Sequence, residues 1–258
     1  MFIDSHCHLD CIDLKNHNNS LAELMTEVAS NGVEHMLCVC IDLFEFDKMY
    51  ATVKNFPQVS VSAGMHPTHA VGNALSVESI LDYVSREEVV AVGETGLDYF
   101  YQKDKPDWQQ QRFRHHIAAA REVKKPVIVH TRDAAEDTLK IITEESAKDC
   151  GGVIHCFTED WDFASAALDQ NFYISFSGIC TFKTAEQIRE VVRKVPADRF
   201  LIETDSPYLA PVPNRGKQNQ PDYVSLVAQC VASERGISVE EVADISRQNF
   251  YNFLSSAG

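Results

Sequence analysis

The sequence has no long hydrophobic run and few positive charges. No apolar stretch approaches the roughly 18 residues of a membrane-spanning helix, and no signal peptide pattern opens the chain, so we expect a cytoplasmic protein without a membrane partner. Only 23 lysines and arginines stand against 38 aspartates and glutamates, a formal net charge of −15. This charge argues against tight binding to long duplex nucleic acid, although a cationic metal centre can still attract a phosphodiester locally.

The sequence also lacks paired cysteine spacing. Its eight cysteines are spread along the chain without a C-x-x-C pair, so neither a disulfide framework nor a zinc–thiolate site is indicated. Most of them lie in apolar, strand-like segments, where we expect buried and reduced thiols.

What the sequence does contain is a regular alternation of short apolar runs and amphipathic stretches. The 258 residues show no composition break, internal repeat or linker, so we expect one domain over residues 1–258. Eight apolar runs separated by helical segments predict an α/β fold, a (β/α)8 TIM barrel, with a doubly wound open sheet as the alternative. The predicted strands are Phe2–Ser5, Glu34–Cys40, Val59–Gly64, Val89–Gly93, Val127–Val129, Gly152–Ile154, Tyr173–Phe176 and Phe200–Ile202. Predicted helices include Leu21–Asn31, Ser76–Ser85, Trp108–Lys124 and Ala134–Ser146.

Nearly every predicted strand ends in a histidine or a carboxylate. The first ends in Ser5-His6-Cys7-His8, and because side chains alternate along a strand, His6 and His8 face the same way. Two imidazoles on one face are half of a metal site, since neutral imidazole binds several transition metals. The catalytic groups of a barrel gather at the carboxyl ends of its strands. The later ends carry His66, Glu94, Asp98, His130, Arg132, His155, Glu203 and Asp205.

Six of these residues make up the predicted ligand set, namely His6, His8, Glu94, His130, His155 and Asp205. Six ligands exceed the needs of one four-coordinate zinc ion and suit two divalent cations roughly 3.5–4 Å apart. We expect Glu94 to bridge, with His6, His8 and Asp205 on one ion and His130 and His155 on the other. Nitrogen-rich ligation favours Zn²⁺, Mn²⁺, Co²⁺ or Fe²⁺ over Mg²⁺. The histidines assigned to loops, strand starts or packing are His17, His35, His69, His115 and His116.

Taken together, these motifs resemble the TatD-type metal-dependent deoxyribonuclease family, a branch of the amidohydrolase-like barrels. The resemblance covers the whole chain, and its motifs are Ser5-His6-Cys7-His8-Leu9-Asp10, Gly64-Met65-His66-Pro67, Gly93-Glu94-Thr95-Gly96-Leu97-Asp98-Tyr99, His130-Thr131-Arg132, His155-Cys156-Phe157, Glu203-Thr204-Asp205-Ser206-Pro207-Tyr208 and Asn214-Arg215-Gly216-Lys217. It implies a barrel hydrolase that cleaves phosphodiesters in DNA, often from a 3′ end. It also implies ligand roles at the same six positions and dependence on magnesium, which differs from the preference that the ligand chemistry indicates.

The expected reaction is phosphodiester hydrolysis by a hydroxide that bridges the two metals. Asp205 is the first candidate for the general base, and Glu203 and His66 are further catalytic candidates. Asp98 is expected to orient a ligating histidine. Three cations, Arg132, Arg215 and Lys217, are candidate phosphate contacts, and the aromatic rings of Phe100, Tyr101 and Tyr208 are candidates for stacking on bases.

The expected substrates are DNA ends or short oligonucleotides, and no obligate protein partner is inferred. One alternative is an amidohydrolase-type enzyme that hydrolyses a small-molecule ester or C–N bond, because the same barrel supports acyl chemistry. The other is a non-catalytic metal-binding or docking protein. The cations near the mouth favour an anionic substrate, and the presence of a base candidate disfavours a non-catalytic role.

Overall fold

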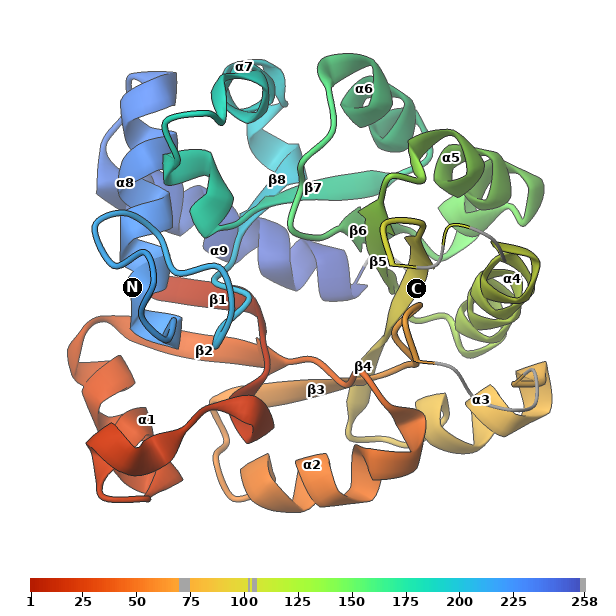
Figure 1. Ribbon diagram of the computed structural model, residues 1–258, viewed down its shortest axis with the longest axis horizontal. Helices are drawn as coiled ribbons and strands as arrows, with labels where there is room; N and C mark the ends of the chain where they lie inside the picture. The colour runs from red at the N-terminus through yellow and green to blue at the C-terminus, as the bar shows by residue number, and fades with distance from the viewer. Residues whose placement is uncertain (70–74, 102, 104–105, 256–258) are drawn as a thin grey trace.

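The structure is a computed structural model that describes residues 1–69, 75–101, 103 and 106–255 (Figure 1). Eight strands form one sheet in the order of the chain, and each strand pairs in parallel with the next. A parallel bridge between Cys7 and Ser206 joins the first strand to the segment that follows the last. The sheet therefore closes into a (β/α)8 barrel, so the predicted fold is confirmed and the open doubly wound sheet is wrong. The strands are β1 (Phe2–Cys7), β2 (Val33–Cys38), β3 (Val59–Ala63), β4 (Val89–Asp98), β5 (Val127–Arg132), β6 (Gly152–Ile154), β7 (Phe172–Phe176) and β8 (Phe200–Ile202).

Helices surround the barrel on its outer side (Figure 1). Several begin at a residue whose side chain accepts a hydrogen bond from the first turn, as Ser20, Ser76 and Asp160 do for α1, α3 and α6. The four helices predicted from the sequence are present with small differences at their ends. The helices are α1 (Leu21–Ser30), α2 (Phe46–Val53), α3 (Val77–Val84), α4 (Pro106–Val123), α5 (Ala135–Glu144), α6 (Trp161–Asp169), α7 (Glu186–Lys194), α8 (Val224–Arg235) and α9 (Val239–Ser255).

Strand β4 runs on to Asp98, past the predicted end at Gly93. Glycine usually weakens a strand, which is why the sequence suggested an end there. In the barrel, Gly96 pairs with His130 of β5, and a Cβ at Gly96 would lie 2.0 Å from the carbonyl oxygen of His130. The missing side chain thus lets β4 approach β5 closely and carry its polar end to the mouth of the barrel.

The amino end of the barrel is filled with apolar side chains. Inward-facing residues of the strands, such as Ile3, Ile128 and Leu201, pack with Phe250 and Phe253 of α9. The side chain of Asn249 donates to the carbonyl oxygen of Phe200 at 2.8 Å, at the start of β8. Helix α9 therefore closes the amino end, which leaves the carboxyl end as the open one.

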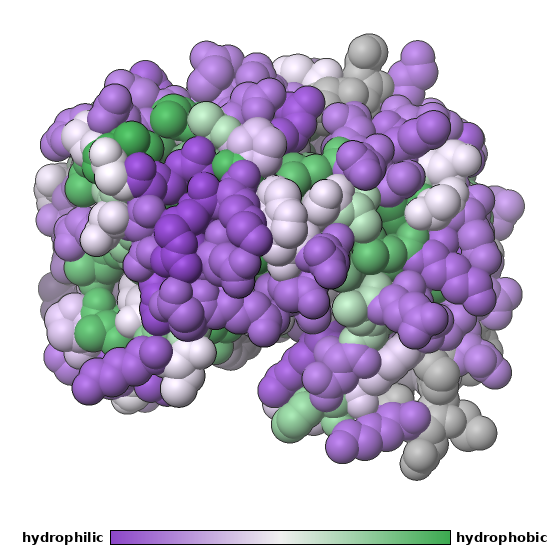
Figure 2. All heavy atoms as spheres, turned by 90° about the horizontal axis from the view of Figure 1, so that it is seen from above, coloured by the Kyte–Doolittle hydropathy of each residue, from purple (hydrophilic) through white to green (hydrophobic). Residues whose placement is uncertain are grey.

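The cysteines behave largely as predicted. All eight are free thiols and five are buried, whereas Cys11 is exposed, so the expectation of burial is wrong for that residue. Hydrophilic side chains cover most of the face seen in Figure 2, as the composition indicates. Within the described residues, no helix combines the length and the apolar character that crossing a membrane requires.

Candidate metal centre

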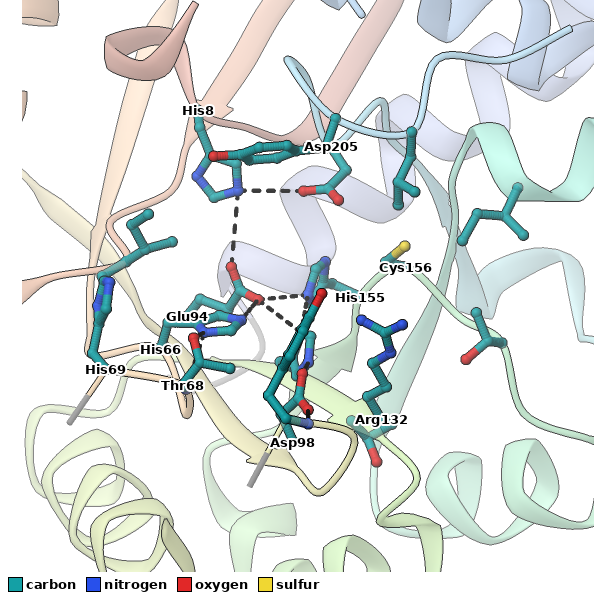
Figure 3. Close-up of a pocket in the computed structure, with 18 residues that line it drawn as sticks. His8, His66, Thr68, His69, Glu94, Asp98, Arg132, His155, Cys156 and Asp205 are labelled. Carbon is teal, nitrogen blue, oxygen red and sulfur yellow. Dashed lines mark hydrogen bonds and ion pairs between the residues drawn. The ribbon is translucent and has the colours of Figure 1, made fainter. Parts of the chain in front are cut away.

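A cavity of about 750 Å³ opens at the carboxyl end of the barrel. Five of the six predicted ligands line it (Figure 3). The sixth, His6, lies buried beside His8 and Glu94. Strand alternation explains their position, because His130 follows the inward-facing Ile128 by two residues, as His155 follows Val153. In β1 the pairing register shifts between Asp4 and Cys7, and His6 and His8 point inward together.

The first group of ligand atoms joins the end of β1 to the segment that follows β8. The Nε2 atoms of His6 and His8 lie 3.3 Å apart. Oδ1 of Asp205 lies 3.3 Å from Nε2 of His8 and 3.7 Å from Nε2 of His6. Oε2 of Glu94 lies 3.4 Å from the same His6 nitrogen. Two imidazoles and two carboxylates thus converge on one small space.

The second group lies on the other side of the Glu94 carboxylate. Its Oε1 atom is 2.8 Å from Nε2 of His155 and 3.1 Å from Nδ1 of His130, and these two nitrogens are 3.4 Å apart. Nε2 of His66 is 3.4 Å from the same oxygen. Glu94 therefore presents one oxygen to each group, which is the grouping that the order of the strands suggested.

The electrostatics of the cluster fit divalent cations. Burial alone would raise the pKa of Glu94, but the charge of His155 and hydrogen bonds from His130 and His155 hold it well below its usual range. Burial alone would lower the pKa of His8, yet Asp205 raises it to about 9. Nδ1 of His6 and Oε2 of Glu203 are buried without a hydrogen-bond partner. The carboxylates thus attract positive charge to this space, and clusters drawn from these residues can hold a metal ion.

Outer contacts fix the orientation of the His8 and His130 imidazole rings. Nδ1 of His8 lies 2.9 Å from the carbonyl oxygen of Val39, and Nε2 of His130 lies 3.2 Å from Oδ2 of Asp98. Such contacts hold a ring so that its other nitrogen faces the metal. The structure therefore places Asp98 where the sequence suggested, behind a candidate ligand.

Glu203 lies behind the ring of His155 rather than in the cavity. Its Oε1 is 3.3 Å from Nδ1 of His155 and accepts a hydrogen bond from the backbone N–H of Cys156 at 2.7 Å. The side chain is buried and does not line the cavity. This geometry suits a residue that orients His155 and does not suit the catalytic base that the sequence suggested.

Two buried polar residues that the sequence analysis missed hold the turn that carries Asp205. Asp4 accepts hydrogen bonds from the backbone N–H of Thr204, at 2.8 Å, and from its hydroxyl. Asn219 donates to the carbonyl oxygens of Thr204 and Tyr208 at 2.7 and 2.6 Å. Because Asp4 is a carboxylate inside an apolar strand, the sequence could have indicated that it has a buried polar partner. Nothing in the sequence pointed to Asn219.

A buried arginine of α4, also missed, supports the loop that carries His66. The guanidinium of Arg112 donates to the carbonyl oxygens of His66, Pro67 and His69 at 2.6 to 3.0 Å. Nearby, Nε2 of His116 accepts a hydrogen bond from the backbone N–H of Met65 at 3.2 Å. His116 is thus a packing residue, as expected, with a defined hydrogen-bonding role.

Two other histidines differ from the sequence interpretation. His17 is buried at the end of a short 3-10 helix (Leu14–His17), where it lies 3.1 Å from a carboxylate oxygen of Glu27. His69 lines the cavity, and its Nδ1 donates to the carbonyl oxygen of Ile41 at 2.7 Å. The first is a packing residue outside the site, and the second belongs to the cavity wall although the sequence analysis left it out.

The cations proposed as phosphate contacts fall into two classes. Arg132 lines the cavity, and its guanidinium lies 3.8 Å from the centre of the Phe100 ring. Arg215 and Lys217 are exposed and do not line the cavity, and the guanidinium of Arg215 lies 4.0 Å from the centre of the Phe182 ring. The structure therefore does not bring the loop cations to the site. Tyr101 and Tyr208 line the cavity, but one face of Phe100 is covered by Arg132.

A parallel barrel that gathers imidazoles and carboxylates at its carboxyl end has the architecture of a metal-dependent hydrolase. Comparison with known families gives the same answer: residues 3–255 match the model of the TatD-related DNase family. The chain belongs to this family, and it is a metal-dependent hydrolase. The family that the sequence motifs suggested is thereby confirmed.

Individual relatives cover nearly the whole chain. The chain is 48% identical over 248 residues to the uncharacterized metal-dependent hydrolase YcfH of Escherichia coli K12, with 96% of this chain and 93% of the relative covered. It is 31% identical over 220 residues to the 3′-5′ ssDNA/RNA exonuclease TatD of Escherichia fergusonii, with 83% and 85% covered. The crystal structure of YjjV, a TatD homologue from E. coli K12, superposes with a TM-score of 0.88 at 25% identity, covering 98% of this chain and 97% of that one.

Proposed function

We propose that the protein is a two-metal phosphodiesterase that removes nucleotides from DNA ends or short oligonucleotides, most simply from the 3′ end. The observation that carries this proposal is the Glu94 carboxylate, which turns one oxygen toward each of two ligand groups. Two-metal sites of this kind stabilise the attacking and leaving oxygens of a displacement at phosphorus. The similarity to a relative named as an exonuclease supports the choice of substrate. We further propose that residues 1–258 act as one domain.

The ligand chemistry suggests where two cations would sit. His6, His8 and Asp205 would hold one, His130 and His155 the other, and Glu94 both. Bound there, the cations would lower the pKa of a water and stabilise negative charge on phosphate oxygens. The four nitrogen ligands favour Zn²⁺, Mn²⁺, Co²⁺ or Fe²⁺ over Mg²⁺.

Asp205 is the residue that we propose to accept a proton from the attacking water. Burial alone would raise the pKa of this carboxyl, but a hydrogen bond from His8 and the charge of His6 keep it below its usual range. The carboxylate is therefore ionised at neutral pH. It lines the cavity and is the more accessible of the two buried carboxylates in the cluster, with its side chain 13% exposed against 3% for Glu94.

His66 is suited to donate a hydrogen bond to the phosphate. The backbone N–H of Thr68 donates to Nδ1 of His66 at 3.2 Å, so the ring proton resides on Nε2, which faces the cluster. Burial lowers the pKa of His66 to about 3, which keeps the ring neutral. We therefore assign it a role in binding substrate rather than in delivering a proton as an imidazolium.

A nuclease assay beside a panel of small esters and amides tests the proposal. Purified protein with analysed metal content is incubated with 5′-labelled and 3′-labelled single strands and with matched duplexes. We expect metal-dependent shortening of the 5′-labelled strand from its 3′ end. Hydrolysis of an ester or amide without cleavage of any strand would replace the proposal with the amidohydrolase alternative.

The variant Asp205→Asn tests the base assignment in the same assay. It keeps the size and one oxygen ligand but removes the charge, so kcat should fall by about 10²- to 10⁴-fold with metal in excess, while KM changes much less. Asp198→Asn, at an exposed carboxylate, serves as the matched control. Recovery of near-native kcat by excess metal would leave Asp205 as a ligand only.

A further inference from the structure

Arg132 differs from the other cations of the chain in what it touches. It is the only lysine or arginine among the described residues that line the cavity. Its guanidinium lies 3.8 Å from the centre of the Phe100 ring and 5.2 Å from that of Tyr101. Figure 3 shows the side chain extending into the cavity from the end of β5. The charged group is thus held by aromatic rings at the wall of the site.

The carboxylate of Asp98, which lines the same cavity, forms no ion pair with Arg132. Oδ2 of Asp98 faces Nε2 of His130 at 3.2 Å, and its Oδ1 accepts a hydrogen bond from the backbone N–H of Tyr101 at 3.1 Å. No ion pair or side-chain hydrogen bond links the Arg132 guanidinium to another described residue. Stacking uses only the faces of a guanidinium, so its in-plane N–H donors remain free for a bidentate contact with an anion.

The position of Arg132 separates it from the candidate metal cluster. Arg132 follows His130 by two residues on β5, so the two side chains share a face and start roughly 6.6 Å apart along the strand. This distance is on the scale of the separation between neighbouring phosphates in an extended nucleic-acid strand. One cavity therefore offers two places for an anion, one at the cluster and one at Arg132.

We propose that Arg132 binds the phosphate next to the one that is cleaved, so that the preferred substrate carries a second phosphate. The inference rests on the proposed phosphodiesterase function and sharpens it. The substrate class becomes a strand, or a dinucleotide with a terminal phosphate, rather than a simple phosphodiester. Phe100 and Tyr101 then serve to hold the guanidinium in the orientation that this phosphate requires.

Ligand binding tests the second phosphate site without turnover. Isothermal titration compares thymidine 3′,5′-bisphosphate with thymidine 3′- and 5′-monophosphates on the metal-loaded protein. Because a charge-assisted bidentate contact is strong, we expect the bisphosphate to bind about 10- to 100-fold more tightly than either monophosphate.

Three variants test whether Arg132 causes this difference in affinity. Arg132→Gln should abolish the difference and Arg132→Lys should keep part of it. Arg121→Gln, at a surface arginine paired with Asp149, should keep all of it. Equal affinities in the unsubstituted protein, or a preference that survives Arg132→Gln, would overturn the inference.

Cleavage of dinucleotides separates this inference from the function on which it rests. The substrates are TpT, pTpT and TpTp, which share one cleavable bond and differ in the terminal phosphate. We expect one phosphorylated dinucleotide to show a kcat/KM about 10- to 100-fold above that of TpT, and Arg132→Gln to bring this ratio close to one. Equal kcat/KM for all three contradicts the inference alone. A preserved preference for the bisphosphate without cleavage of any strand contradicts the phosphodiesterase function alone.

Discussion

The two ends of the barrel are built from the same strands and have opposite character. At the amino end, Ile128, Val153 and Leu201 pack against phenylalanines of α9 in a closed apolar core. At the carboxyl end, the same strands or the residues directly after them present imidazoles and carboxylates to an open cavity. A step of two residues, from Ile128 to His130 or from Val153 to His155, separates the two environments. Stability and chemistry therefore occupy neighbouring layers, and each can be changed while the other is measured.

At the carboxyl end of the barrel, we expect removal of Glu94 to have the largest effect on activity and metal content. We expect Glu94→Ala to abolish measurable turnover and to lower the metal content by at least one ion per chain, because both ligand groups lose an oxygen. The barrel should remain folded, because its apolar core does not include this residue, but the metal-free protein loses the ion pairs of Glu94 with His130 and His155. Metal analysis, activity and urea unfolding are measured beside Glu87→Ala, an exposed control. Full activity with two metals bound would remove Glu94 from the centre.

The converse change is Phe250→Ala at the amino end. Phe250 is fully buried in the inner core, and its truncation should lower the free energy of unfolding by about 3–5 kcal/mol. Metal content and kcat of the folded fraction should remain near native. The neighbouring Tyr251 is 46% exposed, and Tyr251→Ala should cost about 0.5 kcal/mol or less. Loss of metal binding in folded Phe250→Ala protein would show that the two layers are coupled.

The buried His116, which lies behind the candidate metal centre, should make the free energy of unfolding depend on pH. Burial lowers the pKa of His116 to about 3, and the positive charges of Arg112 and His115 act in the same direction. Because this pKa lies below the unfolded value of about 6.5, His116 contributes stability above pH 6.5 that is lost as the pH falls toward 3. Between pH 7 and pH 5 the loss should approach about 2 kcal/mol, at about 1.4 kcal/mol per pH unit.

The matched variant is His116→Gln, whose amide can make the same two hydrogen bonds, to the backbone N–H of Met65 and the carbonyl oxygen of Arg112. Urea unfolding of the metal-free protein at both pH values should show a shallower pH dependence in this variant. Equal slopes in the two proteins would mean that His116 titrates normally in the folded state.

The smallest effect is expected at Arg215, which lies on the carboxyl side but outside the cavity. Its guanidinium stacks on Phe182, and its charge is exposed. Arg215→Ala should change KM for an oligonucleotide by less than about twofold, because this side chain does not line the cavity. Steady-state kinetics over a range of salt concentrations measure this. A clear rise in KM with unchanged metal content would return the loop to the role that the sequence suggested.

The sequence predicted the barrel well because its signals are local. Apolar runs with a histidine or carboxylate two residues further along are visible at Ile128-Val129-His130 and Val153-Ile154-His155. Contacts between distant segments are not visible in this way. Arg112 donates to the backbone carbonyl of a remote loop, and Asn219 donates to that of Thr204 in the turn before it. The loop with Arg215 turns its cation onto Phe182. Hydrogen bonds to a backbone leave no pattern in the sequence, and a charge in a loop does not reveal which way it points.

The contact between Asp4 and Thr204 spans almost the whole chain, with a separation of 200 residues. His6 and His8 belong to β1 and the residue after it, whereas the turn with Asp205 follows β8. The two imidazoles and the Asp205 carboxylate therefore meet only where the segment after the last strand docks beside the first strand. Any fragment that stops before β8 lacks the Asp205 carboxylate. Assembly of the complete cluster thus requires a closed barrel, and metal binding by all six residues would report that closure.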